Sequence, residues 1–236
     1  MRLLLVSSSN VHGSGYLDHA EGEIRALGAK RIAFAPFALA DRDGYTARVR
    51  ERLARMEIEV VELKSARELD GVDALFVGGG NTFRLLKTMY DLSLLDPIRL
   101  RVRSGALHYI GSSAGTNIAA PTIRTTNDMP IVEPPSFDAL RLVPFQINPH
   151  YLDPDPASTH QGETREERVL QFLEENTTPV IGLRESSMLR VVDSEVTLVG
   201  TTTARIFVRG RTPYEATPGL VLLPPGEGTE TGVDYV

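Results

Sequence analysis

The sequence predicts an α/β protein with a mostly parallel, twisted sheet that is flanked by helices and continued by an antiparallel C-terminal extension. Two observations predict this fold class. In the first half of the chain, short apolar runs alternate with segments of helical period, which is typical of parallel strands joined by crossover helices. From Val180 onward, short β-type runs follow one another with only turns between them, which favours antiparallel pairing.

The elements of the first half come in strand and helix order. Each expected strand is a brief aliphatic run, and each expected helix spaces its apolar residues by three or four positions. We expect strands at residues 3–6, 32–34, 58–61, 74–77 and 107–110, with helices at 16–27, 44–56 and 82–90.

The second half begins with one turn of helix after Ser113 and a loop-rich stretch at 121–135. A helix at 164–176 is indicated by a capping box, in which Thr164 precedes Glu167 by three positions. Further strands are expected at 142–147, 180–183, 188–192, 196–199 and 205–208, the last four extending the same sheet. We interpret residues 1–236 as a single catalytic domain, with residues 226–236 as a mobile tail.

Composition excludes several classes of function. Acidic residues outnumber basic ones by 31 to 25 and the basic residues form no stripe, so we expect no nucleic-acid partner. No apolar run reaches the ~18–20 residues of a membrane span, so no membrane partner is expected. The N-terminal apolar run is too short for an export signal and turns polar at Ser7, which predicts a cytoplasmic protein.

The side chains that commonly carry metals or nucleophilic sulfur are limited. The absence of cysteine excludes disulfides, thiolate zinc sites and a cysteine nucleophile. Clusters of His, Asp and Glu with the spacing of zinc ligands are also missing, so we expect neither metal nor cofactor.

The sharpest motif is the segment Gly111-Ser112-Ser113-Ala114-Gly115, which fits the G-x-S-x-G pattern of a nucleophile elbow. An apolar strand precedes it and a helical turn follows, as that motif requires. Small residues on both sides of Ser113 allow the tight turn that exposes its hydroxyl. The alternative is an ordinary Gly/Ser-rich turn between a strand and a helix.

A serine nucleophile needs a base and an orienting acid. Of the two histidines that follow Ser113, His150 ends an expected strand, whereas His160 lies among polar loop residues. The acid is either Glu185, which follows another short strand, or Asp128, which lies on the loop after the elbow. Only Asp128 would give the nucleophile–acid–base order common in α/β-hydrolases. The residue pattern leaves both open.

A glycine cluster, Gly78-Gly79-Gly80, ends the strand at 74–77 and opens the next helix. Its backbone N–H groups could approach a ligand closely, as an oxyanion hole or a phosphate cradle requires, or the cluster could be a plain tight turn. It lacks the lysine of a P-loop and the spacing of a dinucleotide fingerprint. We expect Gly80 and Ala114, together with Gly79, to provide oxyanion donors.

Several segments together resemble peptidase E, a family of aspartyl dipeptidases in the serine peptidase group that includes cyanophycinase. The resemblance covers nearly the whole chain. It implies Ser113 as nucleophile, His150 as base and Glu185 as acid, on a fold like class I glutamine amidotransferases, whose elbow carries cysteine. This chain departs from the pattern of the bacterial enzymes at two positions. Ser112 stands where those enzymes have tryptophan, and Arg184 stands where they have proline. The matching segments are 77–83 (VGGGNTF), 113–115 (SAG), 121–132 (PTIRTTNDMPIV), 146–150 (QINPH) and 162–166 (GETRE).

The function that we predict on these grounds is a serine dipeptidase that cleaves after an N-terminal aspartate through an acyl-enzyme. Its partner would be a small acidic dipeptide, and the protein would be a monomer or homodimer. Arg165 would bind the substrate β-carboxylate, unless it is a surface residue paired with Glu166 or Glu167. Asp128, if it is not the acid, would hold its loop or bind the substrate ammonium group. The rivals are a cyanophycinase-like or esterase hydrolase of another acidic substrate, and a non-catalytic binding protein.

Overall fold

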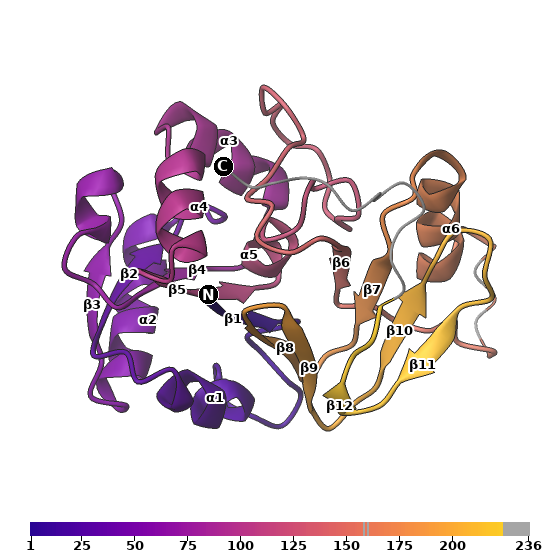
Figure 1. Ribbon diagram of the computed structural model, residues 1–236, viewed down its shortest axis with the longest axis horizontal. Coiled ribbons are helices and arrows are strands. Elements are labelled where there is room, and N and C mark those ends of the chain that lie inside the picture. Colours follow the sequence, from indigo (N-terminus) through magenta and orange to yellow (C-terminus); the bar gives the residue numbers. More distant parts are fainter. Residues whose placement is uncertain (158, 160, 224–236) are drawn as a thin grey trace.

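The computed structural model describes residues 1–157, 159 and 161–223, and it contains two β-sheets with helices packed against them (Figure 1). The expected tail at residues 226–236 lies outside the described residues, as does His160. The strands are β1 Arg2–Val6, β2 Arg31–Ala35, β3 Glu59–Glu62, β4 Ala74–Val77, β5 His108–Ser112, β6 Gln146–Pro149, β7 Val180–Leu183, β8 Ser187–Val192, β9 Glu195–Gly200, β10 Ala204–Phe207, β11 Tyr214–Ala216 and β12 Gly219–Leu220. The helices are α1 Glu21–Ala26, α2 Arg42–Ala54, α3 Thr82–Asp91, α4 Leu95–Arg103, α5 Ala114–Asn117 and α6 Arg165–Glu175, with short 3₁₀ turns at Asp18–Ala20 and Ala66–Leu69.

The larger sheet confirms the predicted fold class. Its strand order is β12-β9-β8-β1-β5-β4-β2-β3, and the five strands from β1 to β3 in this order are parallel. Successive residues of β1 face opposite sides: Leu3 and Leu5 join the core under α3 and α4, whereas Leu4 and Val6 join the core under α1 and α2. Burial on both faces explains why these strands are continuous apolar runs.

The predicted C-terminal extension is correct for part of the chain and wrong for the rest. Strands β8, β9 and β12 do continue the large sheet in antiparallel order. Strands β7 and β10, however, belong to a second sheet of order β11-β10-β7-β6, in which β6 and β7 are parallel. Their apolar runs look the same in either sheet, because sheet membership is decided by pairing between distant segments.

One strand boundary and one helix also differ from expectation. The strand expected at 142–147 begins only at Gln146, while Leu142, Val143 and Phe145 are buried as irregular chain. Helix α4 was not anticipated, and Pro97 lies in its first turn, where the missing N–H leaves no hydrogen bond broken. The expected capping box of α6 is confirmed, since Thr164 and Glu167 bond each other's backbone N–H groups.

The two sheets share one core. Ile147 of β6 and Ile181 of β7 belong to the same buried cluster as Leu3 and Leu5 of β1. Helix α6 covers the opposite face of the smaller sheet, where Val169 packs in a separate buried cluster (Figure 1). This shared core supports our proposal that the chain forms a single domain. In the part of the chain that the structure describes, no helix has the length and apolarity to cross a membrane.

Candidate active site

Ser113 lies at a sharp turn between β5 and α5, with backbone angles φ 52° and ψ −108° that a residue with a side chain rarely adopts. The flanking glycines permit this turn. A Cβ atom at Gly111 would lie 2.5 Å from the carbonyl oxygen of Gly115, and one at Gly115 would lie 2.1 Å from the carbonyl oxygen of Val77. The strand–turn–helix setting expected for an elbow is therefore present, and its spacing has a steric cause.

His150 and Glu185 meet the Ser113 side chain. The Ser113 Oγ lies 2.9 Å from His150 Nε2, and His150 Nδ1 lies 2.8 Å from Glu185 Oε1. The serine follows β5 of the large sheet, while the histidine and the glutamate follow β6 and β7 of the small sheet. About a third of the His150 side chain and half of the Glu185 side chain are exposed, so the group opens to solvent.

Asp128, the other candidate acid, lies elsewhere. Its Oδ2 accepts hydrogen bonds from the backbone N–H and the hydroxyl of Thr82 at 2.7 Å and 2.6 Å, and from the Thr126 hydroxyl. It therefore caps the first turn of α3, where a negative charge is favourable. Among the two carboxylates that the sequence left open, the geometry selects Glu185 as the partner of the imidazole.

The buried Ser7 side chain joins the two sheets beneath the histidine. Its hydroxyl donates to the carbonyl oxygen of Leu183 at 2.7 Å and accepts the backbone N–H of His150 at 3.0 Å. Its own N–H donates to the Ser187 carbonyl oxygen. His150 has φ 53°, another strained conformation, and this hydrogen bond helps to hold it. Only the position of Ser7 at the end of an expected strand hinted at this role before the structure.

The glycine loop passes directly over Ser113, since a Cβ atom at Gly79 would lie 3.0 Å from the serine Cβ. One expected donor is wrong: the Gly79 N–H is already used, because it donates to the Tyr45 hydroxyl at 2.9 Å. The N–H groups of Gly80 and Ala114 have no acceptor within the described residues. Tyr45 belongs to α2. The sequence pattern does not predict its hydrogen bond with Gly79, because a buried tyrosine in a helix is ordinarily a core residue.

Arg165 is the first residue of α6, and its side chain is half-buried. The alternative of a surface ion pair is wrong: Glu166 pairs with Arg205, and Glu167 closes the capping box. Within the described residues Arg165 has no ion pair of its own. Burial and the nearby Arg168 lower the pKa of Arg165, and the charge of Asp128 acts in the opposite direction.

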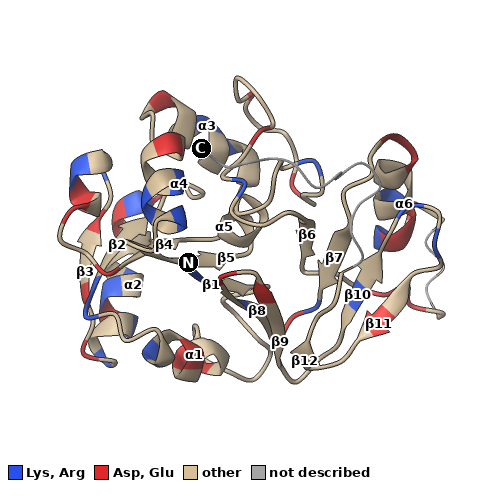
Figure 2. Ribbon diagram, viewed as in Figure 1, with Lys and Arg blue, Asp and Glu red and all other residues tan. Residues whose placement is uncertain are grey.

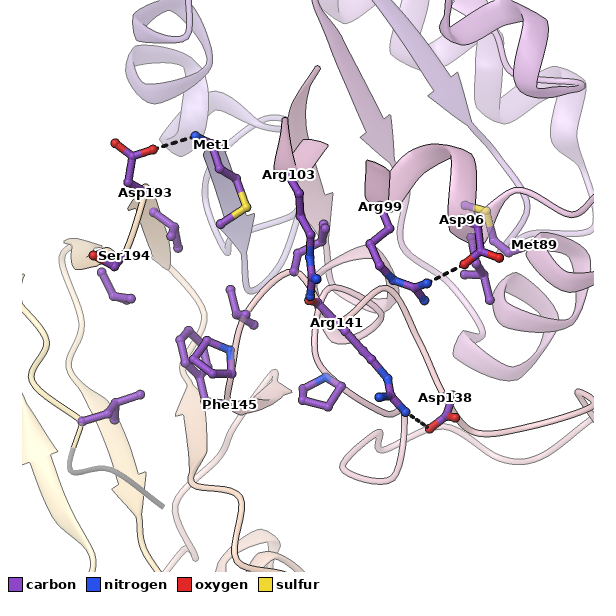
Figure 3. A pocket seen from close by; sticks show the side chains of 18 of the residues that line it. Met1, Met89, Asp96, Arg99, Arg103, Asp138, Arg141, Phe145, Asp193 and Ser194 are labelled. Atoms are coloured by element: carbon purple, nitrogen blue, oxygen red, sulfur yellow. Dashed lines mark hydrogen bonds and ion pairs between the residues drawn. The ribbon is translucent and has the colours of Figure 1, made fainter. Parts of the chain in front are cut away.

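Other features of the described chain lie away from this site. A cavity of about 1410 Å³ lies beside α4 and the start of β1, at the opposite ends of the parallel strands, and it is not lined by Ser113, His150, Glu185, Asp128 or Arg165 (Figure 3). Two of its charged pairs are Arg99 with Asp96 and Arg141 with Asp138 (Figure 3). The described residues include no cluster of three or more potential metal ligands.

A serine hydroxyl beside an imidazole that is itself bonded to a carboxylate, all at the ends of strands, is typical of serine hydrolases. The chain belongs to peptidase family S51, whose family model matches residues 3–199.

Similar proteins agree with this assignment. The chain is 56% identical to a protein of Streptomyces coelicolor named peptidase E, over 93% of this chain and 92% of that protein. It is 51% identical to a Drosophila melanogaster protein named "Probable alpha-aspartyl dipeptidase", over 87% and 89% of the two chains. The crystal structure of a peptidase from an acI-B1 actinobacterium shares the fold, with a TM-score of 0.66 at 17% identity over 92% and 94% of the chains.

The close contact between Gly115 and Val77 leads to a stability prediction. Gly115→Ala should lower the free energy of unfolding by about 3 kcal/mol, because the new methyl group has to displace backbone rather than a mobile side chain. Urea unfolding measures this. Gly22→Ala in α1 is the control, since nothing lies within 4 Å of its Cβ position, and it should raise stability by about 0.5–1 kcal/mol. Equal stability of the two variants would contradict the steric account of the elbow.

Proposed function

We propose that this protein is a serine dipeptidase that hydrolyses Asp-Xaa dipeptides after the N-terminal aspartate. The observation that carries the proposal is the series of hydrogen bonds from Ser113 through His150 to Glu185. Membership of peptidase family S51 supports the peptidase activity, and the names of the similar proteins support the dipeptide and its aspartate. We include in the proposal a cytoplasmic location and a monomeric or homodimeric state.

In the proposed mechanism the Ser113 Oγ attacks the aspartyl carbonyl carbon while His150 Nε2 takes the hydroxyl proton. Glu185 accepts a hydrogen bond from His150 Nδ1–H, which fixes the tautomer and stabilises the imidazolium. The imidazolium then protonates the departing amine of the second residue, leaving an aspartyl ester on Ser113. Water attacks this ester with His150 as base, and aspartate is released.

The oxyanion of each tetrahedral intermediate would lie between the N–H groups of Gly80 and Ala114. Both are without an acceptor in the described structure, and a donor that waits for the developing charge needs no rearrangement at the moment of reaction. Tyr45 supports this arrangement by fixing the neighbouring Gly79 N–H. Gly79 thus contributes to the oxyanion site by shape rather than as a donor.

Recognition of aspartate is proposed for Arg165 and Asp128. Within the described residues the half-buried guanidinium of Arg165 has no ion pair, so it favours an incoming anion, and its planar fork can bind a carboxylate through two hydrogen bonds. Within the described structure Asp128 accepts hydrogen bonds only through Oδ2, which leaves Oδ1 for the substrate ammonium group. The electrostatic effect of Asp128 on Arg165 supports placing the two at one substrate site.

The rival functions are separable by experiment. Purified protein should hydrolyse Asp-Leu but not Leu-Asp, and a serine-directed inhibitor should abolish the reaction. A panel of Asp-, Glu- and Asn-led dipeptides beside simple esters distinguishes this activity from a cyanophycinase-like or esterase activity. Absence of turnover on the whole panel would favour the non-catalytic binding protein. The hydrogen bonds from Ser113 through His150 to Glu185 argue against that alternative.

The two adjacent serines give the first kinetic prediction. Ser113→Ala should leave a folded protein whose turnover of Asp-Leu is reduced by roughly 10³-fold or more, because only binding and oxyanion stabilisation remain. Ser112→Ala is the matched control and should lose far less, since that side chain is buried within β5. A reversed order of the two losses would place the nucleophile at Ser112.

Substitution of Arg165 tests the aspartate site. Arg165→Ala should lower kcat/KM for Asp-Leu by about 10²-fold, roughly 3 kcal/mol for a lost charge-assisted pair. Arg165→Lys should recover only part of this loss, because an ammonium group cannot form the forked contact. If the alanine variant keeps its preference for aspartate, the specificity belongs to another residue, and Arg124 on the loop after the elbow is the next to test.

The support that Tyr45 gives to the glycine loop predicts a selective effect on turnover. Tyr45→Phe keeps the ring contact with Phe34 but leaves the buried Gly79 N–H without an acceptor. We expect kcat for Asp-Leu to fall by about tenfold with little change in KM, since the loop holds an oxyanion donor that acts mainly in the transition state. Tyr90→Phe, which removes a hydroxyl bonded to the Asp138 carbonyl oxygen, should leave kcat unchanged.

A further inference from the structure

Arg184 stands immediately before Glu185, and all five of its N–H groups are satisfied. Its Nε and Nη2 donate to the two carboxylate oxygens of Asp153 at 2.8 Å and 2.7 Å. Its Nη1 and Nη2 donate to the two oxygens of Glu215 at 2.8 Å and 3.0 Å. The fifth N–H donates to the Thr203 hydroxyl at 2.8 Å. Two carboxylates thus each bind one edge of the planar guanidinium group through two hydrogen bonds.

The Cζ atom of the same guanidinium lies over the ring of Tyr151, 5.4 Å from its centre. Tyr151 directly follows His150, and Asp153 lies two residues further along the same loop. The Arg184 side chain is only 17% exposed, so its interactions are weakly screened. These hydrogen bonds raise the pKa of Arg184 and lower the pKa of Glu215 to about 2, consistent with strong mutual attraction.

The network continues to the start of α6. Glu215 also accepts a hydrogen bond from Arg205, and Arg205 pairs with Glu166 at 3.2 Å. In Figure 2, β10 carries a blue segment and the neighbouring strand β11 a red one. Glu166 directly follows Arg165. The network therefore includes a residue directly beside each of three site residues: Tyr151 beside His150, Arg184 beside Glu185, and Glu166 beside Arg165.

The Glu185 carboxylate has one hydrogen-bond partner among the described residues, the His150 imidazole, so its position depends on how the chain around it is held. Its side chain is 53% exposed, and the next residue, Ser186, has φ 66°. The backbone around it is held by two side chains: Ser187 donates to the Arg184 carbonyl oxygen and Thr202 donates to the Glu185 carbonyl oxygen. An anchored Arg184 fixes the chain on the other side of the carboxylate.

We propose that Arg184 is a positioning residue that holds the His150 imidazole and the Glu185 carboxylate in line with Ser113, through Tyr151 and Asp153 on one side and Glu215 on the other. This inference rests on the proposed serine dipeptidase function. Without Arg184, three carboxylates would face the single cation of Arg205, and the loop after His150 would separate from β11. A lysine cannot replace the arginine, because it has three donors and no planar fork.

The test compares Arg184→Ala and Arg184→Lys with Arg99→Ala. Arg99 is the control because it is another partly buried arginine with several partners, one carboxylate and two backbone carbonyl oxygens, but it lies beside the distant cavity of Figure 3. Three quantities are measured: kcat and KM for Asp-Leu, the rate at which diisopropyl fluorophosphate labels Ser113, and the melting temperature. The labelling rate reports the alignment of the serine and histidine without needing an aspartyl substrate.

Arg184→Ala should lower kcat and the labelling rate together by about 10- to 100-fold, because a displacement of about 1 Å can cost that much. We expect KM to stay within about twofold, since Arg165 still binds the substrate. Arg184→Lys should recover only part of both rates. Arg99→Ala should lower the melting temperature, as Arg184→Ala does, but keep both rates.

Unchanged rates in Arg184→Ala, or equal losses in Arg99→Ala, would overturn the proposal. If the wild-type protein does not hydrolyse Asp-Leu but its labelling slows in Arg184→Ala, the proposed substrate is wrong and the positioning role stands. If the wild-type serine is not labelled at all, both proposals fail. If Arg184→Ala does not fold, Asp153→Asn is the second variant. It weakens the bidentate contact between Asp153 and Arg184 without changing the size of the side chain, and it should lower the labelling rate by about threefold or more.

Discussion

The hydrogen bonds of the Ser7 hydroxyl connect the two sheets, and the alignment of the candidate site depends on that connection. Ser113 is attached to the large sheet, whereas His150 and Glu185 are attached to the small one. A hydrogen bond of 2.9 Å between them requires the two sheets to keep a fixed relation. Ser7 at the end of β1 bonds both the Leu183 carbonyl oxygen and the His150 N–H, and Asn117 of α5 adds a second link by donating to the Ile147 carbonyl oxygen. Both links are buried, so neither exchanges freely with water.

Strain at the site is held by close packing around it. Ser113 and His150 both adopt positive φ, which costs free energy that the surroundings have to offset. At Ser113 the offset comes from glycines that let α5 and β4 approach to a distance no side chain would allow. The glycine loop above the serine is fixed in turn by Tyr45 from the far helix layer. A rigid elbow beneath a rigid donor loop is the geometry that preorganised oxyanion binding needs.

Charge is distributed unevenly around the candidate active site. Arg184, Arg205 and their carboxylate partners form a fully paired network behind the site, whereas Arg165 at the start of α6 has no ion pair within the described residues. The paired charges serve geometry, because bidentate contacts fix orientation. In the function that we propose, the charge of Arg165 serves recognition, because a half-buried cation is stabilised by an anion that arrives with the substrate. The capping box explains why Arg165 does not pair with Glu167, two positions further along α6. The Glu167 carboxylate is bound to Thr164 instead.

The sequence by itself determined the local features: the strand–turn–helix around Ser113, the capping box of α6, the five parallel strands and the residues Ser113, His150 and Glu185 as candidates. Each of these depends on side chains close together in the chain, where periodicity and turn chemistry are legible. For the acid, the residue pattern allowed Glu185 and Asp128, the family resemblance implied Glu185, and the structure places Glu185 at the imidazole. The tertiary structure alone assigned β7 and β10 to a second sheet and showed that the Gly79 N–H donates to Tyr45. It also revealed the hydrogen-bond partners of Ser7 and Arg184, which lie up to 176 and 31 residues away along the chain. Such contacts depend on which distant segments pack together, and no local pattern of residues encodes that choice.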